Sequence, residues 1–255
     1  MQKVTKAIIA LTASYILFGL YAFGVFLQQP LIKGESLTIQ ATLEPFVYVL
    51  LMVIGNFLIF KAVYSQERSQ KCFFDEKKLL APTILLLLLL SFGAGIHTAG
   101  QLIEETFVNT NANIQHFTEN FTAQVAYFLE EYPAHFLVAL PYLILLYFLA
   151  KLELNRPPIT LKNVEKGIIV ISAMLYGIIF AILNAEGHVT IFAIVLAGYF
   201  IYSLYRSKQQ VKRKFMDMPF STYFVIGNTL MILLNVLFGI LYGWSVQPTE
   251  LGFSS

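Results

Sequence analysis

Seven apolar stretches, each about twenty residues long, constrain the fold of this chain more than any other feature of its sequence. They lie near residues 6–28, 43–64, 79–102, 133–151, 165–184, 188–206 and 219–243. An α-helix needs about 20 mostly apolar residues to cross the hydrocarbon core of a bilayer. Hydrophobic residues make up 57% of the 255 residues and charged residues 13%, more apolar surface than a soluble domain of this size could bury. The sequence therefore predicts an all-α, polytopic integral membrane protein, a bundle of about seven transmembrane helices in one domain, residues 1–255.

Two of these stretches also fit other interpretations. Lys3 and Lys6 precede the first stretch, as in a secretory signal peptide. The apolar run is too long for one and has no small-residue cleavage site, so we expect a retained helix. Only four residues, Asn184 to Gly187, separate the fifth and sixth stretches. We divide them there, because a single helix of about forty residues would overshoot the bilayer and Gly187 can form a turn.

The basic residues are sorted to one side of the predicted membrane. Of the seventeen Lys and Arg residues, all but Lys33 fall at the N-terminus or in the loops after the second, fourth and sixth helices. Positive charge is retained in the cytoplasm during insertion. The pattern therefore predicts a cytoplasmic N-terminus and an external C-terminus, in a plasma (inner) membrane.

One long external segment, residues 103–132, lies between the third and fourth predicted helices and contains no Lys or Arg. Apolar residues recur through it at steps of three and four: Ile114, Phe117, Phe121, Val125 and Phe128. This spacing places them on one face of a helix. We expect an amphipathic helix that lies on the outer leaflet or covers the bundle.

All four histidines fall on the external side of this topology. His97, His135 and His188 lie at the outer ends of three different helices, whereas His116 lies in the external segment, opposite the apolar stripe, where we expect it to be solvated. Carboxylates gather on the same side, against the single Lys33. They are Glu35, Glu44, Glu104, Glu105, Glu119, Glu130, Glu131, Glu186 and Glu250.

Each of the three helix-end histidines has polar neighbours at short spacing. Gln101 and Glu104 follow His97 by four and then three residues, which stacks them on one helix face. The other neighbours are Glu130 and Glu131, just before His135, and Glu186, two residues before His188. Imidazole and carboxylate are the usual ligands of zinc, iron and manganese sites. The sequence therefore predicts that His97, His135 and His188 bind a divalent metal, zinc in the first place and iron or manganese as alternatives.

In this prediction Glu131 or Glu104 acts as general base, while Gln101, Glu186, Glu130 and Asn235 support the site. Structural roles are the competing explanation. Small residues beside His97 favour close helix packing, and the acidic pair before His135 can complement a helix dipole. Since Cys72 is the single cysteine, a cysteine-rich metal site is excluded.

The function that these residues favour is a zinc-dependent hydrolase acting on a lipid or another amphiphile. Seven helices around a three-histidine zinc site resemble, in architecture, the membrane hydrolases of the alkaline ceramidase and adiponectin-receptor group. The group places a Ser shortly before a His on an early helix and a His-x-x-x-His pair on the last. Here Ser91 precedes His97 by six residues and the last helix has no His, so no residue role is carried over.

Three other functions remain open from the sequence. His and Glu at a pore mouth fit a cation, metal or proton-coupled permease, and two histidines can ligate a haem. A metal-free receptor or assembly factor is the third. Membrane lipids are the expected partners, and nucleic-acid binding is not implied, because the basic loops are explained as topology signals.

Overall fold

The structure is a computed structural model in which residues 1–22, 39, 43, 54–64, 76–109, 121–248 and 251 are described. Every extended regular element within these ranges is helical, which confirms the all-α prediction. The elements are α1 (Lys3–Ala22), α3 (Ile54–Tyr64), α4 (Glu76–Asn109), α6 (Phe121–Leu129), the π-helical turn η3 (Glu130–Ala134), α7 (His135–Leu154), α8 (Asn163–Glu186), α9 (Thr190–Val211), the 3-10 turn η4 (Phe215–Asp217) and α10 (Pro219–Tyr242).

Five helical segments are long and apolar enough to cross a membrane. They are Ala81–Gly100, Gln124–Leu154, Asn163–Glu186, Thr190–Val211 and Pro219–Tyr242. The predicted helices at 6–28 and 43–64 correspond to α1 and α3, and residues 23–28 and 44–53 of these predictions lie outside the described part of the chain. Five long apolar helices indicate an integral membrane protein.

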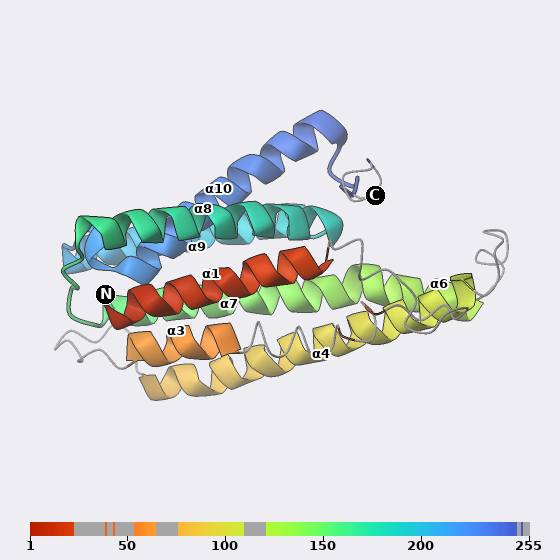
Figure 1. Ribbon diagram of the computed structural model, residues 1–255, viewed down its shortest axis with the longest axis horizontal. Coiled ribbons are helices and arrows are strands. Elements are labelled where there is room, and N and C mark those ends of the chain that lie inside the picture. The colour runs from red at the N-terminus through yellow and green to blue at the C-terminus, as the bar shows by residue number, and fades with distance from the viewer. Residues whose placement is uncertain are drawn as a thin grey trace.

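The basic ends of the helices lie together at one end of the bundle (Figure 1). Two contacts illustrate this meeting of distant segments. The Gln2 backbone N–H donates to Glu165 Oε1 at 2.6 Å, and Arg213 Nη1 donates to the carbonyl of Leu154 at 3.3 Å. The orientation predicted from the charge pattern would place this end in the cytoplasm. We call the opposite end of the bundle the outer end.

A cluster of aromatic rings fills the centre of the bundle between α1, α7, α8 and α10. Tyr15 contacts Tyr142, Tyr176 and Phe180 with ring centroids 5.5–5.8 Å apart, and Tyr176 stacks on Tyr223 at 5.2 Å. Tyr15, Tyr142, Tyr176 and Tyr223 are almost fully buried. Large aromatic side chains thus join four helices that are distant in the sequence.

Two glycines face each other where helices α8 and α10 pack together. A Cβ at Gly177 would collide with the Gly227 carbonyl, and a Cβ at Gly227 would collide with the Tyr176 ring. Small residues let two helix backbones approach closely in a membrane. Beyond this contact α10 diverges from α8 toward the outer end (Figure 1).

The external segment differs from its prediction. Helix α4 continues to Asn109, and α6, η3 and α7 form one helical run from Phe121 to Leu154, which therefore begins before the predicted start at residue 133. The physical reason is that Pro133 is accommodated in a π-helical turn instead of ending the helix.

Helix α6 packs along α4 and does not cover the bundle (Figure 1). Ala126 is buried, and its carbonyl lies 3.0 Å from where a Cβ at Gly100 would be. Phe121, Val125 and Phe128 from the predicted apolar stripe are exposed on the other face, while Ile114 and Phe117 lie outside the described residues.

At the basic end of the bundle, a buried carboxylate joins α7 to the start of α10. Glu153 is 2% exposed and accepts the backbone N–H groups of Phe220 at 3.1 Å and Ser221 at 2.7 Å, together with the Ser221 hydroxyl at 2.9 Å. The first N–H groups of a helix have no partner within it and carry partial positive charge. Glu153 therefore serves as an N-terminal cap supplied by a different helix.

Replacing this cap should destabilise the bundle. We expect Glu153→Ala to lower the free energy of unfolding by about 2 kcal/mol, because buried N–H donors lose a charged acceptor. Glu153→Gln, which keeps one acceptor oxygen, should lose less. Thermal unfolding in detergent micelles, followed by circular dichroism, measures both. Equal midpoints for the wild type and the alanine variant would contradict the capping role.

Candidate functional site

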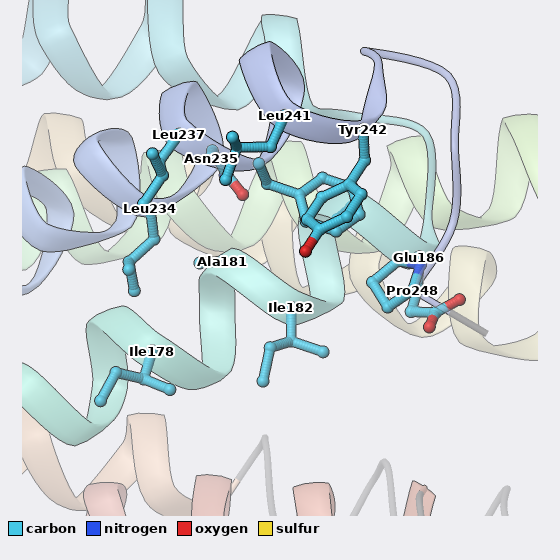
Figure 2. Close-up of a pocket in the computed structure, with 12 residues that line it drawn as sticks. Ile178, Ala181, Ile182, Glu186, Leu234, Asn235, Leu237, Leu241, Tyr242 and Pro248 are labelled. Carbon is cyan, nitrogen blue, oxygen red and sulfur yellow. The ribbon is translucent and has the colours of Figure 1, made fainter. Parts of the chain in front are cut away.

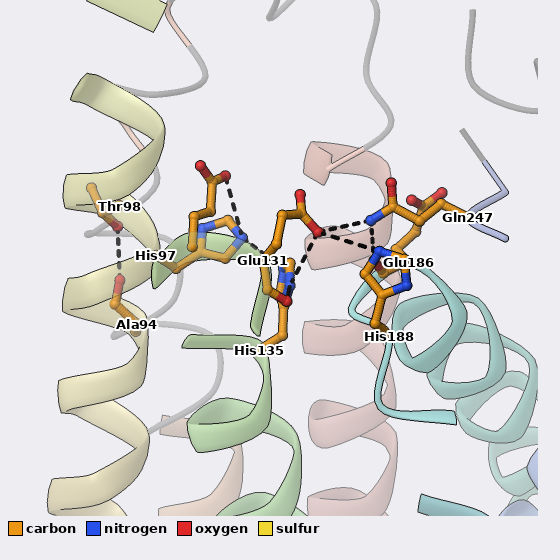
Figure 3. Close-up of polar contacts among 9 residues, drawn as sticks. Ala94, His97, Thr98, Glu131, His135, Glu186, His188 and Gln247 are labelled. Carbon is orange, nitrogen blue, oxygen red and sulfur yellow. Dashed lines mark hydrogen bonds and ion pairs between the residues drawn. The ribbon is translucent and has the colours of Figure 1, made fainter. Parts of the chain in front are cut away.

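Three of the four histidines lie together at the outer end of the bundle (Figure 3). His97 is in α4, His135 is the first residue of α7, and His188 lies in the turn between α8 and α9. At a rise of about 1.5 Å per residue, His97 and His135 lie about 25–30 Å from Lys78 and Lys151 on their own helices. This is close to the thickness of a hydrocarbon core, about 30 Å. His116 lies outside the described residues.

A direct contact joins the imidazoles of His97 and His135. Their Nε2 atoms are 2.9 Å apart, and the ring planes cross at 64°. His135 Nδ1 lies 3.0 Å from the backbone carbonyl of Glu131, which can only accept a hydrogen bond. The Nδ1 atom must therefore carry the proton, and in the neutral ring the lone pair is on Nε2. This lone pair faces His97, so the contact requires either a proton donated by His97 Nε2 or a cation bound by both rings.

The π-helical turn η3 explains why the Glu131 carbonyl is available. In a regular α-helix it would accept the backbone N–H of His135. Here that N–H is directed to the carbonyl of Tyr132, and Pro133 within the turn has no N–H at all. The side chain of His135 takes the vacated position. Single π-helical turns inside α-helices occur frequently at functional sites.

The same turn directs the side chains of two consecutive glutamates toward different histidines. Glu130 Oε1 lies 4.0 Å from His97 Nε2, whereas Glu131 Oε2 lies 3.9 Å from His135 Nδ1 and 3.9 Å from His188 Nε2. Glu130 is 7% exposed and packs against Gly100 of α4. A Cβ at Gly100 would lie 2.8 Å from the Glu130 Cβ. The absence of a side chain at Gly100 is thus what lets Glu130 approach His97.

Glu131 is also held by the C-terminal segment. Gln247 Nε2 donates hydrogen bonds to Glu131 Oε2 at 2.8 Å and to the backbone carbonyl of Glu186 at 2.7 Å (Figure 3). On the opposite side, the His188 ring stacks on Tyr132 with centroids 5.6 Å apart and planes 11° apart. Neither Gln247 nor Tyr132 was expected from the sequence, since Gln247 is 116 residues from Glu131 and no local spacing connects them.

His188 adopts an unusual backbone conformation for its position. Its φ angle is +53°, in the left-handed region that few residues other than glycine enter. Gly187 beside it packs directly on His135, because an added Cβ would lie 3.0 Å from both Cβ and Cγ of that residue. The backbone of the α8–α9 turn therefore packs against the Cβ and Cγ atoms of His135.

The predicted site residues fall into distinct groups. His97, His135, Glu130, Glu131 and His188 form one connected cluster. Within the described ranges, however, no three His, Cys, Asp or Glu side chains are arranged as a ready-made metal site. Asn235 lines a cavity between α8 and α10 instead of the cluster. Gln101 and Glu104 belong to α4, but their side chains lie outside the described part of the structure.

The fold and the cluster together define an all-α integral membrane protein with paired imidazoles and carboxylates at its outer end. No family model, curated protein or solved structure matches this chain.

Adding one methyl group at the α8–α9 turn should disturb the imidazole pair. We expect Gly187→Ala to displace the His135 ring, because the new Cβ would meet it at 3.0 Å. Gly198→Ala on α9 is the matched control, since a Cβ there meets nothing within 4 Å. Imidazole resonances in histidine-labelled protein report the displacement. Identical spectra for the wild type and Gly187→Ala would show that the turn does not position His135.

Proposed function

We propose that this protein is a membrane metalloenzyme that binds a divalent ion, zinc in the first place, between His97, His135 and Glu130, and hydrolyses a lipid or another amphiphile. One observation carries the proposal. The Nε2 atoms of His97 and His135 converge to 2.9 Å, and the Glu131 carbonyl fixes the His135 tautomer that leaves a lone pair at this point. Backbone control of the distal ring nitrogen is the usual arrangement for a metal-binding histidine.

The distances fit a metal site after small side-chain movements. With zinc–nitrogen bonds of about 2.0–2.1 Å, two ligands of a tetrahedral ion lie about 3.3 Å apart. The two imidazoles would separate slightly from 2.9 Å, and Glu130 Oε1 would approach His97 from 4.0 Å. Two histidines and one glutamate leave the fourth position open, as in catalytic zinc sites.

This ligand set differs from the three histidines expected from the sequence. His188 contacts the cluster through Glu131, not through the imidazole pair. In the proposal Glu130 takes the place of the third histidine as a ligand. Glu131, 3.9 Å from both His135 and His188, is the candidate general base. A bound divalent ion would supply a water molecule that ionises near neutral pH and would polarise a substrate carbonyl.

The position of the cluster supports an amphiphilic substrate. It lies at the ends of long apolar helices, near the depth at which lipid carbonyl groups meet water. A membrane-embedded site at this level is reached laterally by molecules that are already dissolved in the bilayer.

The imidazole pair also favours one alternative. A direct N–H···N hydrogen bond between His97 and His135 accounts for the 2.9 Å contact without a metal. Such a pair could carry protons in a permease or simply join helices in a receptor or assembly factor. Haem ligation by this pair is less compatible, because two axial nitrogens lie about 4 Å apart across an iron, given metal–imidazole bonds of about 2.0 Å.

Metal analysis of matched variants tests the ligand set. We expect about one equivalent of zinc in the purified wild type, and its loss in His97→Ala, His135→Ala and Glu130→Gln, because each removes one of three ligands. His188→Ala should retain the metal, since His188 is not one of the three proposed ligands and its ion-pair partner in the cluster is Glu131. Elemental analysis after dialysis makes the measurement. No metal in the wild type, or full retention in His97→Ala and His135→Ala, would reject the site and favour the hydrogen-bonded pair.

Activity assays separate hydrolysis from transport. We expect the zinc-loaded protein to cleave acyl lipids in mixed micelles, with a fall of at least about 100-fold in kcat for Glu131→Gln while its metal content is unchanged. Ion flux into proteoliposomes measures the competing permease function. Flux of zinc or protons without any lipid cleavage would overturn the enzyme assignment.

A further inference from the structure

A cleft lies between α8 and α10, toward the C-terminal ends of both helices (Figure 2). Its volume is about 510 Å³, within the range of about 300–1,000 Å³ that small-molecule sites occupy. It lies on the outer side of the Gly177–Gly227 contact, where the two helices diverge. Leu237 and Leu241 line it and are more than half exposed, so the cleft is open laterally to lipid.

One buried polar group in this apolar cleft has an unmet hydrogen-bonding requirement. Asn235 is 1% exposed, and its Nδ2 group has no acceptor among the described residues. An amide donor without a partner in apolar surroundings is costly, and acyl chains offer it no acceptor. A 180° rotation of the amide about χ2, which exchanges Nδ2 and Oδ1, would turn this donor into the cleft, where a carbonyl oxygen of an occupant would satisfy it.

The depth of Asn235 identifies the kind of carbonyl. It lies seven residues before the end of α10 at Tyr242, about 10 Å below the outer end of the helix at a rise of about 1.5 Å per residue. In a membrane glycerolipid the ester carbonyls lie at the edge of the hydrocarbon core, with the chains below and the headgroup above. An acyl chain would then lie between Ile178, Ile182 and Leu237.

The outer end of the cleft meets the histidine–glutamate cluster. Glu186 and Pro248 line this end, and Gln247, adjacent to Pro248, bonds both the Glu186 carbonyl and Glu131. Glu186 brings negative charge to the position of the headgroup. The sequence also assigns nine glutamates and a single lysine, Lys33, to the outer side. Such surroundings attract an amine-bearing headgroup and repel an anionic one.

We infer that the α8–α10 cleft binds one acyl lipid with an amine-bearing, zwitterionic headgroup, its ester carbonyl accepting from Asn235 and its amine lying near Glu186. Lipid binding here needs no metal. The inference rests on the proposed function only in assigning this lipid class as the substrate, because the headgroup would lie beside Glu131.

Competition between two lipids tests the inference. Purified protein is equilibrated with equimolar phosphatidylethanolamine and phosphatidylglycerol of identical chains, and the retained lipid is counted by native mass spectrometry. We expect one phosphatidylethanolamine per chain. Leu237→Trp, which fills the cleft, and Asn235→Leu, which removes the donor, should each reduce its retention about tenfold, the effect of losing roughly 1.4 kcal/mol of binding free energy.

Leu233→Trp is the matched control for the filled cleft. Leu233 lies one turn before Leu237 on α10, is equally lipid-facing at 61% exposure, and is not among the cleft-lining residues. It should retain lipid like the wild type. Equal retention by Leu237→Trp, Asn235→Leu and the control would overturn the cleft site. Equal retention of both lipids, or a preference for phosphatidylglycerol, would overturn the headgroup assignment.

Zinc content measured on the same samples separates this inference from the proposed function. The two cleft variants should keep the metal, which also shows that they are folded, and His97→Ala should lose the metal but keep the lipid. Lipid binding by a wild type that contains no metal leaves the cleft inference intact and rejects the metalloenzyme. Metal binding without lipid retention rejects the cleft inference alone.

Discussion

The hydrogen bond from His135 Nδ1 to the Glu131 carbonyl is the interaction on which the outer site depends. It exists because a π-helical turn containing Pro133 redirects the backbone N–H of His135 to Tyr132. Backbone carbonyls at membrane depth need a partner, since lipid supplies none. The imidazole satisfies this requirement and, in doing so, acquires one tautomer and one orientation. The chemistry available at Nε2 is thus determined by the backbone of the same helix.

Polar side chains elsewhere in the bundle follow the same requirement. Glu153 satisfies the first N–H groups of α10, and Asn228 accepts from the Tyr176 hydroxyl at 3.3 Å while donating to the Phe224 carbonyl at 2.8 Å. Both are buried within the contacts between helices. Against this background Asn235 is different, because its side chain lines a cleft and its buried amide donor has no acceptor among the described residues.

The sequence allowed the helical class and the grouping of histidines at one end to be predicted, because apolar length and charge sorting are properties of local segments. The proximity of His97 to His135 followed from that topology. The role of Glu130 did not, since its approach to His97 depends on the π-helical turn and on the missing Cβ of Gly100. Pro133 was the only local signal of that turn. Gln247 was beyond prediction, because its contacts join residues more than sixty positions apart.

The two hydrogen bonds of Gln247 connect the α8–α10 cleft to the histidine–glutamate cluster. A single uncharged amide group ties the C-terminal segment to the Glu186 carbonyl at the cleft and to the Glu131 carboxylate beside two imidazoles. Any displacement of Pro248 by a molecule entering between α8 and α10 must move this amide as well. Glu131 would then exchange a neutral donor for solvent or for an imidazole. A molecule in the cleft that displaced Pro248 would therefore change the hydrogen bonding of Glu131 beside the two imidazoles.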